Sequence, residues 1–223
     1  MDILQCFTES RHSVDMNDKF FMLSMASIVF NPTFWNIVAR KEYRSKFITR
    51  MFGGNGLYGC YALAATIFIL GLIRDAIFKY AIDRQPEAEC MKNPVIQAIG
   101  LLLLGVGNIF VLSSMWVLGV TGTYLGDYFG ILMEERVTSF PFNVNENPMY
   151  NGTVMIFMGT AIYSLRPAGI YLSCIVHLVY LVALRFEGPF TTQIYLKRDR
   201  ERAAAAKTNG VKKPNKAGSK KDL

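Results

Sequence analysis

The sequence predicts an all-α membrane protein, a polytopic bundle of four to five hydrophobic segments with a long loop at the membrane edge. Of its 223 residues 52% are hydrophobic, and they gather into runs that carry almost no charge. Four long runs cover residues 20–38, 57–73, 95–120 and 168–184. A helix needs about 20 apolar residues to cross the hydrocarbon core, with about 17 as a lower bound. A soluble helix would instead show polar residues at every third or fourth position.

The first run follows the acidic segment DMNDKF, which is unlike the basic start of a cleaved signal peptide. It contains Asn31 and Pro32, and a proline inside a helix removes a backbone hydrogen bond and favours a kink or a break. Two alternatives are therefore open for this run. It crosses the membrane, or it is re-entrant and returns to the side from which it came.

The third run is longer than a span requires, whereas the second and fourth are close to the lower bound. A fifth run, residues 150–165, is shorter and meets the fourth through the turn SLRP. If both cross the membrane they form a hairpin, and the loop at 121–149 lies in the cytosol. If the fifth run does not span, that loop lies in the lumen.

Basic residues indicate the orientation, because Lys and Arg are enriched in cytosolic loops. The stretch at 40–50 and the segment from Arg185 onward are strongly basic, so we expect both on the cytosolic side. The connection between the second and third runs is charge-balanced and fits the lumen. The sequence therefore predicts that the two basic segments share one end of the bundle.

We divide the chain into a membrane-embedded domain, residues 1–195, and a basic cytosolic tail, residues 196–223, that we expect to be disordered. Contact of this tail with anionic lipid is the alternative. The tail has no interleaved aromatic residues, so we expect no nucleic-acid partner. Lys220 and Lys221 match the dilysine pattern that retrieves membrane proteins to the endoplasmic reticulum. The scattered cysteines and histidines show no metal-site spacing, so we expect no metal.

Ionisable residues at the membrane edge are the first functional candidates, because their burial without a partner is costly. They concentrate at residues 122–152, where carboxylates alternate with aromatic residues in a manner that suits a cationic ligand. An amphipathic interfacial stretch with aromatics at headgroup depth is the alternative. The carboxylates of this segment are Asp127, Glu134, Glu135 and Glu146.

A second candidate group follows the fourth run, where Glu187 and Gly188 precede Pro189. We expect the proline to end the helix. An acid near the last turn of a helix is disfavoured by the helix dipole, which prefers cations there, and this conflict favours a functional role for Glu187.

The triplet Gly105-Val106-Gly107 lies inside the third run. A dinucleotide fingerprint would need a preceding strand, a third glycine and an acid about 20 residues later, and the triplet has none of these. On periodicity alone it predicts a close helix–helix contact of the small-residue type.

Several strings belong together: NPTFWNIVARKEY, YALAATIFILGLIRD, LLGVGNIFVLSSM, TGTYLGDYFGILMEERVTSFPFNV, NPMYNG and FEGPFT..IY. Together they resemble the phospholipid methyltransferases that make phosphatidylcholine, from about residue 12 to 195. The resemblance implies an enzyme of the endoplasmic reticulum membrane, and also of the mitochondrial membrane. It would use S-adenosylmethionine to methylate phosphatidyl-N-methylethanolamine and phosphatidyl-N,N-dimethylethanolamine. The implied partner is a membrane phospholipid; the sequence sets no oligomeric state.

The resemblance also implies site residues. In this family the Gly-X-Gly and two consecutive acids after the last span are assigned to S-adenosylmethionine. The corresponding residues here are Gly105, Val106, Gly107, Glu187 and Gly188. A glycine replaces the second acid, so Glu187 acts alone or another acid substitutes. The NPMYNG string resembles a cofactor-facing motif of related enzymes, and it places Asn147, Tyr150 and Gly152 near the cofactor.

The lipid amine must lose a proton before it attacks, since an alkyl ammonium has a pKa of about 10. We expect Asp127, Glu134 or Glu135 to accept that proton, without preference among the three, and aromatic residues such as Tyr128 to stabilise positive charge. Two other functions are alternatives. A prenylcysteine carboxyl methyltransferase would need a His-Pro motif in place of NPMY, and a non-enzymatic lipid-binding protein would bind no cofactor.

Overall fold

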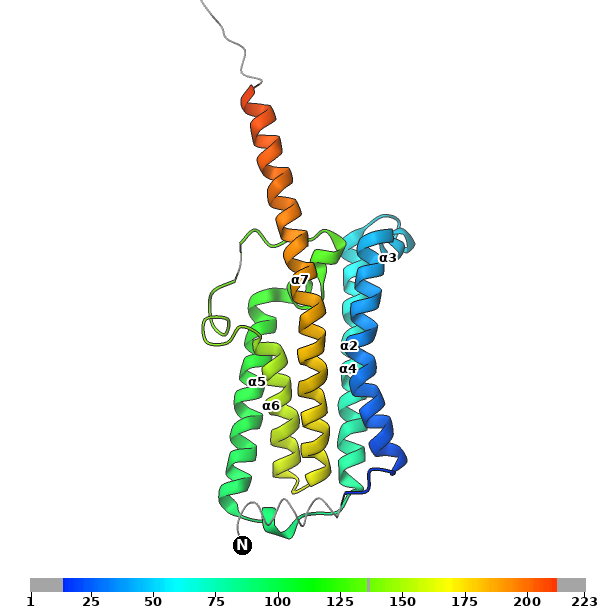
Figure 1. Cartoon of the computed structure of the whole chain (residues 1–223), viewed down its shortest axis with the longest axis vertical. Helices are drawn as coiled ribbons and strands as arrows, with labels where there is room; N and C mark the ends of the chain where they lie inside the picture. Colours follow the sequence, from blue (N-terminus) through cyan, green and yellow to red (C-terminus); the bar gives the residue numbers. More distant parts are fainter. Residues whose placement is uncertain (1–13, 136, 212–223) are drawn as a thin grey trace, which may run out of the picture.

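The computed structural model of the chain describes the backbone of residues 14–135 and 137–211. Figure 1 shows long helices side by side along one axis, and the described residues contain no strand. Four helices of the described part are long and apolar enough to cross a membrane, which confirms the predicted fold class. The elements are α2 (Lys19–Ser45), α3 (Phe47–Met51), α4 (Gly56–Asp83), η1 (Glu89–Met91), α5 (Pro94–Thr123), η2 (Gly126–Phe129), α6 (Pro148–Tyr163) and α7 (Pro167–Val211).

Helix α2 crosses the whole bundle, and its two ends lie at opposite ends of the molecule (Figure 1). The first run is therefore not re-entrant, and of the alternatives at Pro32 a break does not occur, because the helix continues through it. Tertiary contact holds this region in place. The side-chain amide of Asn31 donates a hydrogen bond of 3.1 Å to the carbonyl oxygen of Leu70 in α4, and the Thr33 hydroxyl bonds the carbonyl of Val29.

The expectation that Pro189 ends the last helix is wrong, because α7 continues through it to Val211. Packing beyond the proline accounts for this. The ring of Phe190 stacks on Tyr128 with centroids 5.1 Å apart, and Ile194 is buried. Residues 200–206, RERAAAA, have high helix propensity, so the structure shows helix where the sequence predicts a disordered tail. Residues 212–223, including Lys220 and Lys221, lie outside the described part, and the division into two domains stays a prediction.

Helices α5 and α6 approach each other through glycines. A Cβ atom added to Gly107 would lie 2.6 Å from the carbonyl oxygen of Gly152, and one added to Gly159 would lie 2.6 Å from that of Gly100. The helix–helix contact that the sequence predicts at Gly107 is therefore present. Helix α6 has 16 residues, about 24 Å, and turns directly into α7. This hairpin returns the chain to the end from which α6 starts.

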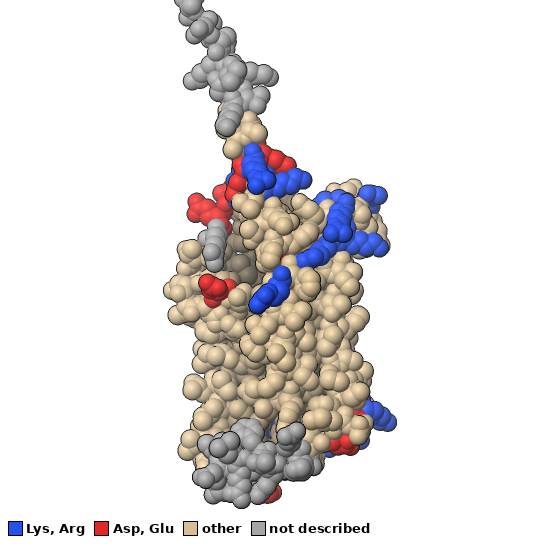
Figure 2. Space-filling model, viewed as in Figure 1, with Lys and Arg blue, Asp and Glu red and all other residues tan. Residues whose placement is uncertain are grey.

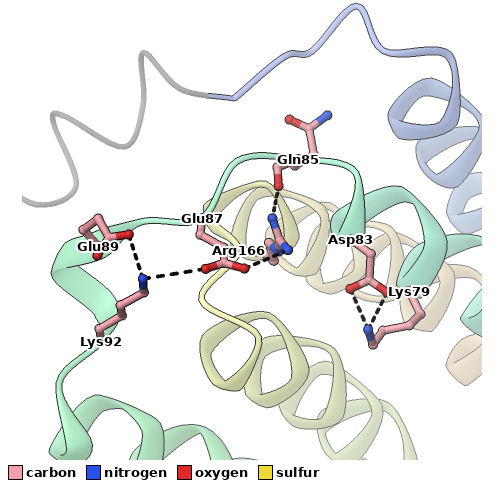
Figure 3. A network of polar contacts seen from close by, with 7 residues as sticks. All are labelled: Lys79, Asp83, Gln85, Glu87, Glu89, Lys92 and Arg166. Carbon is pink, nitrogen blue, oxygen red and sulfur yellow. Dashed lines mark hydrogen bonds and ion pairs between the residues drawn. The ribbon is translucent and has the colours of Figure 1, made fainter.

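One end of the bundle is closed by a polar network (Figure 3). Arg166, in the turn between α6 and α7, donates to the carbonyl oxygen of Gln85 and pairs with Glu87 at 3.0 Å. Lys92 pairs with Glu89 at 2.7 Å, and the hydrogen bond to Glu89 raises the pKa of Lys92. The network ties the connection between α4 and α5 to the start of α7.

The opposite end carries α3, η2, the loop at 130–147 and the projecting part of α7 (Figure 1). Figure 2 shows Lys and Arg side chains gathered at this end, above a long face without charge. Residues 40–50 and the described part of the segment from Arg185 onward both lie here, as the sequence predicts. The loop is attached to this end by Arg198, whose guanidinium donates to the carbonyl oxygen of Met133 at 2.6 Å.

Candidate functional site

Two adjoining cavities lie at the basic end of the bundle, on either side of Glu187. The first, which we call the Tyr150 cavity, has a volume of about 220 Å³. The second, the Thr191 cavity, has a volume of about 130 Å³. Residues that line both are Gly122, Thr123, Leu125 and Glu187. Taken together the cavities reach the size of a small-molecule site, which begins at roughly 300 Å³.

Glu187 is placed by the length of α7. It lies twenty residues after Pro167, which corresponds to a rise of about 30 Å and hence to the far edge of the hydrocarbon core. The hydroxyl of Tyr150 donates a hydrogen bond of 2.7 Å to its Oε2, and Trp35 lines the same cavity. The carboxylate is half-buried, is oriented by a donor from α6 and lines both cavities.

A buried arginine supports this arrangement from within the bundle. The ring of Tyr180 contacts that of Tyr150 edge to face at 4.9 Å, and its hydroxyl accepts a hydrogen bond of 2.7 Å from Arg74. Arg74 is only 8% exposed and pairs with Asp75 at 2.9 Å. A charge inside a membrane helix requires such partners. Arg74 therefore fixes the position of Tyr180, and through it the position of Tyr150.

Asp127 lies in η2, where the chain turns back after α5. Gly119 has φ 63° and ψ −177° inside α5, a conformation that glycine adopts readily, and the helix bends there. Asp127 lines the Thr191 cavity together with Glu187 and accepts a hydrogen bond of 3.0 Å from the hydroxyl of Thr191. The hydroxyl of Thr123, which lines both cavities, is buried with no hydrogen-bond partner in the described part of the chain.

The structure separates the three carboxylates that the sequence ranks equally as proton acceptors. Asp127 lines the Thr191 cavity together with Glu187. Glu134 and Glu135 are exposed in the loop and line neither of the two cavities. Of the three, Asp127 is the carboxylate that a ligand of these cavities would meet.

Of the residues predicted to bind the cofactor, some line the cavities and others do not. Glu187, Asn147 and Tyr150 line the Tyr150 cavity. Gly105 and Gly188 are exposed, with no atom within 4 Å of an added Cβ. Val106 is half-buried, and Gly107 and Gly152 pack against each other. The lining contributed by α5 starts at Leu118, about 16 Å beyond Gly107 along the helix. Cofactor binding by the glycines and Val106 stays a prediction.

Comparison with known proteins identifies relatives of the chain. Residues 95–198 match the family model described as phospholipid methyltransferase. A phosphatidyl-N-methylethanolamine N-methyltransferase of Neurospora crassa is 53% identical over 196 residues, 88% of this chain and 92% of the relative. The chain belongs to the phospholipid methyltransferase family. The enzyme of the same name from Saccharomyces cerevisiae is 51% identical over 189 residues, 85% of this chain and 91% of its own.

The family extends beyond fungi. A phosphatidylethanolamine N-methyltransferase of Rattus norvegicus is 48% identical over 185 residues, 83% of this chain and 92% of the relative. No solved structure matches the chain. The segment that matches the phospholipid methyltransferase family supplies the lining of both cavities except Trp35 and Ile67, which come from α2 and α4. The sequence gives no signal for four further lining residues, because only the packing of helices that are distant in sequence brings them together. They are Trp35, Thr123, Tyr180 and Thr191.

Proposed function

We propose that the protein transfers methyl groups from S-adenosylmethionine to phosphatidyl-N-methylethanolamine and phosphatidyl-N,N-dimethylethanolamine, giving phosphatidylcholine. As a phospholipid methyltransferase it is an enzyme, and its fungal relatives bear the name of this reaction. The observation that carries the proposal is the pair of cavities around Glu187 at the membrane edge. That position is accessible both to a lipid headgroup and to a water-soluble donor.

The residues of the cavities fit S-adenosylmethionine, which carries a sulfonium cation, an amino group and ribose hydroxyls. Glu187 offers a carboxylate for the hydroxyls or the amino group, and the unpartnered hydroxyl of Thr123 offers a further polar contact. Aromatic faces suit both a cation and an adenine ring, and Trp35, Tyr124 and Phe142 line the Tyr150 cavity. When bound, S-adenosylmethionine supplies an electrophilic methyl group.

The chain's own residues prepare the amine. The lipid ammonium is protonated at neutral pH, so a base must take its proton. Asp127 is our candidate because it lines the Thr191 cavity together with Glu187, and the Thr191 hydroxyl orients its Oδ2 atom. Placing the amine in a fixed geometry supplies much of the acceleration in reactions of two bound molecules.

The test uses purified protein in vesicles that contain phosphatidylethanolamine, its monomethyl form or its dimethyl form, with methyl-labelled S-adenosylmethionine. We expect label on the monomethyl and dimethyl lipids, and a loss of at least about tenfold in both labelling and cofactor affinity in Glu187→Gln. Glu201→Gln is the matched control, because Glu201 is exposed on the same helix. Full activity in Glu187→Gln would move the cofactor site elsewhere, and absence of label on every lipid would overturn the function.

We further propose the endoplasmic reticulum membrane as the site of action, with the mitochondrial membrane as a second location. The apolar helices support membrane insertion, and the resemblance supports the choice of organelle. Fractionation of cells that express the full chain, with marker proteins for both membranes, tests this location.

A further inference from the structure

A third cavity, which we call the α2–α7 groove, has a volume of about 490 Å³ and lies between helices α2 and α7. Its lining residues are Val29, Pro32, Thr33, Asn36, Ile37, Arg40, Leu178, Val179, Val182, Ala183 and Phe186. Large apolar side chains of this lining are exposed, among them Ile37 at 61% and Leu178 at 60%. In a bundle that crosses a membrane, such side chains face the acyl chains of lipids.

The groove and the Tyr150 cavity share a wall. Asn36 lines the groove, and the adjacent Trp35 lines the cavity. The same alternation occurs on α7, where Phe186 faces the groove and Glu187 the cavity. A molecule in the groove therefore lies one helix away from the proposed reaction site, at the same level of the bundle.

The groove is apolar along most of its length and ends in a cation. Arg40 donates a hydrogen bond of 2.6 Å to the carbonyl oxygen of Phe186, and its guanidinium lies 4.8 Å from the ring centroid of Phe190. These contacts hold the guanidinium in place without neutralising it. Within the described residues Arg40 belongs to none of the ion pairs.

The guanidinium of Arg40 has an unsatisfied donor at this end of the groove. The Nε of Arg40 is buried and has no hydrogen-bond partner in the described part of the chain. The Oδ1 of Asn36 is also without a partner there, but it is an acceptor and would not bind an anion. Buried polar atoms normally have partners, and a guanidinium has five N–H donors whose planar arrangement matches the oxygens of a phosphate. This end of the groove thus suits an anionic phosphate rather than a cation.

We propose that the α2–α7 groove binds the phospholipid substrate, with an acyl chain along its apolar part and the phosphate on Arg40. The proposal rests on the proposed function and names the residue that holds the substrate. The two charges of the headgroup are then matched separately. The phosphate meets Arg40, and the amine, only two carbons away from the phosphate oxygen, is directed toward the carboxylate of Asp127, which lines the Thr191 cavity together with Glu187. Arg40 bonds the residue adjacent to Glu187, so the two ends of the headgroup are held close together.

The experiment compares two tertiary-amine substrates in mixed micelles, phosphatidyl-N,N-dimethylethanolamine and a 1,2-diacyl-3-dimethylaminopropane that has no phosphate. With Arg40→Gln we expect KM for the phospholipid to rise at least about tenfold with little change in kcat. We expect kcat/KM for the phosphate-free lipid and the affinity for S-adenosylmethionine to remain near wild type. Arg40→Lys keeps the charge but not the planar fork, and it should show an intermediate KM.

Arg44→Gln is the matched control, because Arg44 is an exposed arginine one turn further along α2 and does not line the groove. It should leave both substrates unaffected. An equal loss for both lipids in Arg40→Gln, an equal loss in Arg44→Gln, or an unchanged KM in Arg40→Gln would each overturn the groove as the phosphate site. Failure of the wild-type protein to methylate any lipid would instead be a failure of the proposed function, and it is seen before any variant is made.

Discussion

The hydroxyl of Tyr150 donates a hydrogen bond of 2.7 Å to Glu187, and this bond joins the first turn of α6 to α7. The ring of Tyr180 packs against the ring of Tyr150, with centroids 4.9 Å apart. Arg74 in turn donates a hydrogen bond to the Tyr180 hydroxyl. The acid at the membrane edge is therefore held by side chains from α4, α6 and α7. Such a series of contacts can fix a carboxylate in a region where water cannot orient it.

Tyr150→Phe removes the hydroxyl and leaves the ring. A hydrogen bond to a charged group contributes about 1.5–3 kcal/mol, so we expect affinity for S-adenosylmethionine to fall roughly tenfold or more. Equilibrium binding of the labelled cofactor measures the change. Tyr163→Phe, at the other end of α6 and 50% exposed, should bind normally. An unaltered affinity in Tyr150→Phe would show that the orientation of Glu187 does not depend on this bond.

Gly107→Ala and Gly105→Ala differ by two residues and should differ in stability. The Cβ of the first would lie 2.6 Å from the carbonyl oxygen of Gly152, whereas the second meets no atom within 4 Å. Overpacking costs about 1–3 kcal/mol, so we expect a lower thermal midpoint for Gly107→Ala only. Equal midpoints would contradict the close helix contact. If Gly105→Ala is stable but loses cofactor binding, the family assignment of this triplet is supported instead.

Asp127→Asn tests the proton acceptor. General-base catalysis contributes about 10²–10⁴-fold, so we expect kcat to fall at least about a hundredfold while affinity for S-adenosylmethionine is retained. Glu134→Gln and Glu135→Gln change exposed residues outside both cavities and should keep the wild-type rate. The assay is initial-rate methylation of the dimethyl lipid. A wild-type rate in Asp127→Asn would remove Asp127 as the base.

Arg166→Gln tests the network at the opposite end of the bundle. The change removes the ion pair with Glu87 and the hydrogen bond to the Gln85 carbonyl (Figure 3). We expect a loss of about 1–3 kcal/mol in the free energy of unfolding, measured by denaturant titration in micelles, with kcat per folded molecule unchanged. Lys79→Gln removes only the exposed pair with Asp83 and should cost less than about 1 kcal/mol. Similar losses in both variants would show that Arg166 does not tie the two connections together.

The spans could be predicted because their information is local. Asn55 and Asn93 cap the first turns of α4 and α5 through their side chains. The apolar composition of the runs is enough to identify the helices that can cross a membrane. The rule that a proline ends a helix fails at Pro32 and Pro189. Contacts between residues far apart in sequence, such as the hydrogen bond from Asn31 to Leu70, hold these helices together.

The site was predictable only in part, for the same reason. The sequence indicated Glu187 through a supposed helix end and through the family resemblance, but α7 continues past Pro189, so the argument from the helix dipole does not apply. It indicated Asp127 because the loop is rich in carboxylates. Arg74 and Tyr180 are separated by 106 positions, and nothing in either neighbourhood indicates the other. The α2–α7 groove, which Arg40 lines, likewise forms only when α2 and α7 pack side by side.

The α2–α7 groove opens toward the bilayer along exposed side chains such as Val182, at 57%. A lipid can enter it sideways while its tails remain in hydrocarbon, whereas extraction into water would expose methylene groups at about 0.8 kcal/mol each. Encounter between enzyme and substrate then takes place in two dimensions. The quantity that governs turnover is the mole fraction of methylated lipid in the membrane, and dilution with inert lipid should slow the enzyme even when the total amount of substrate in the tube is constant.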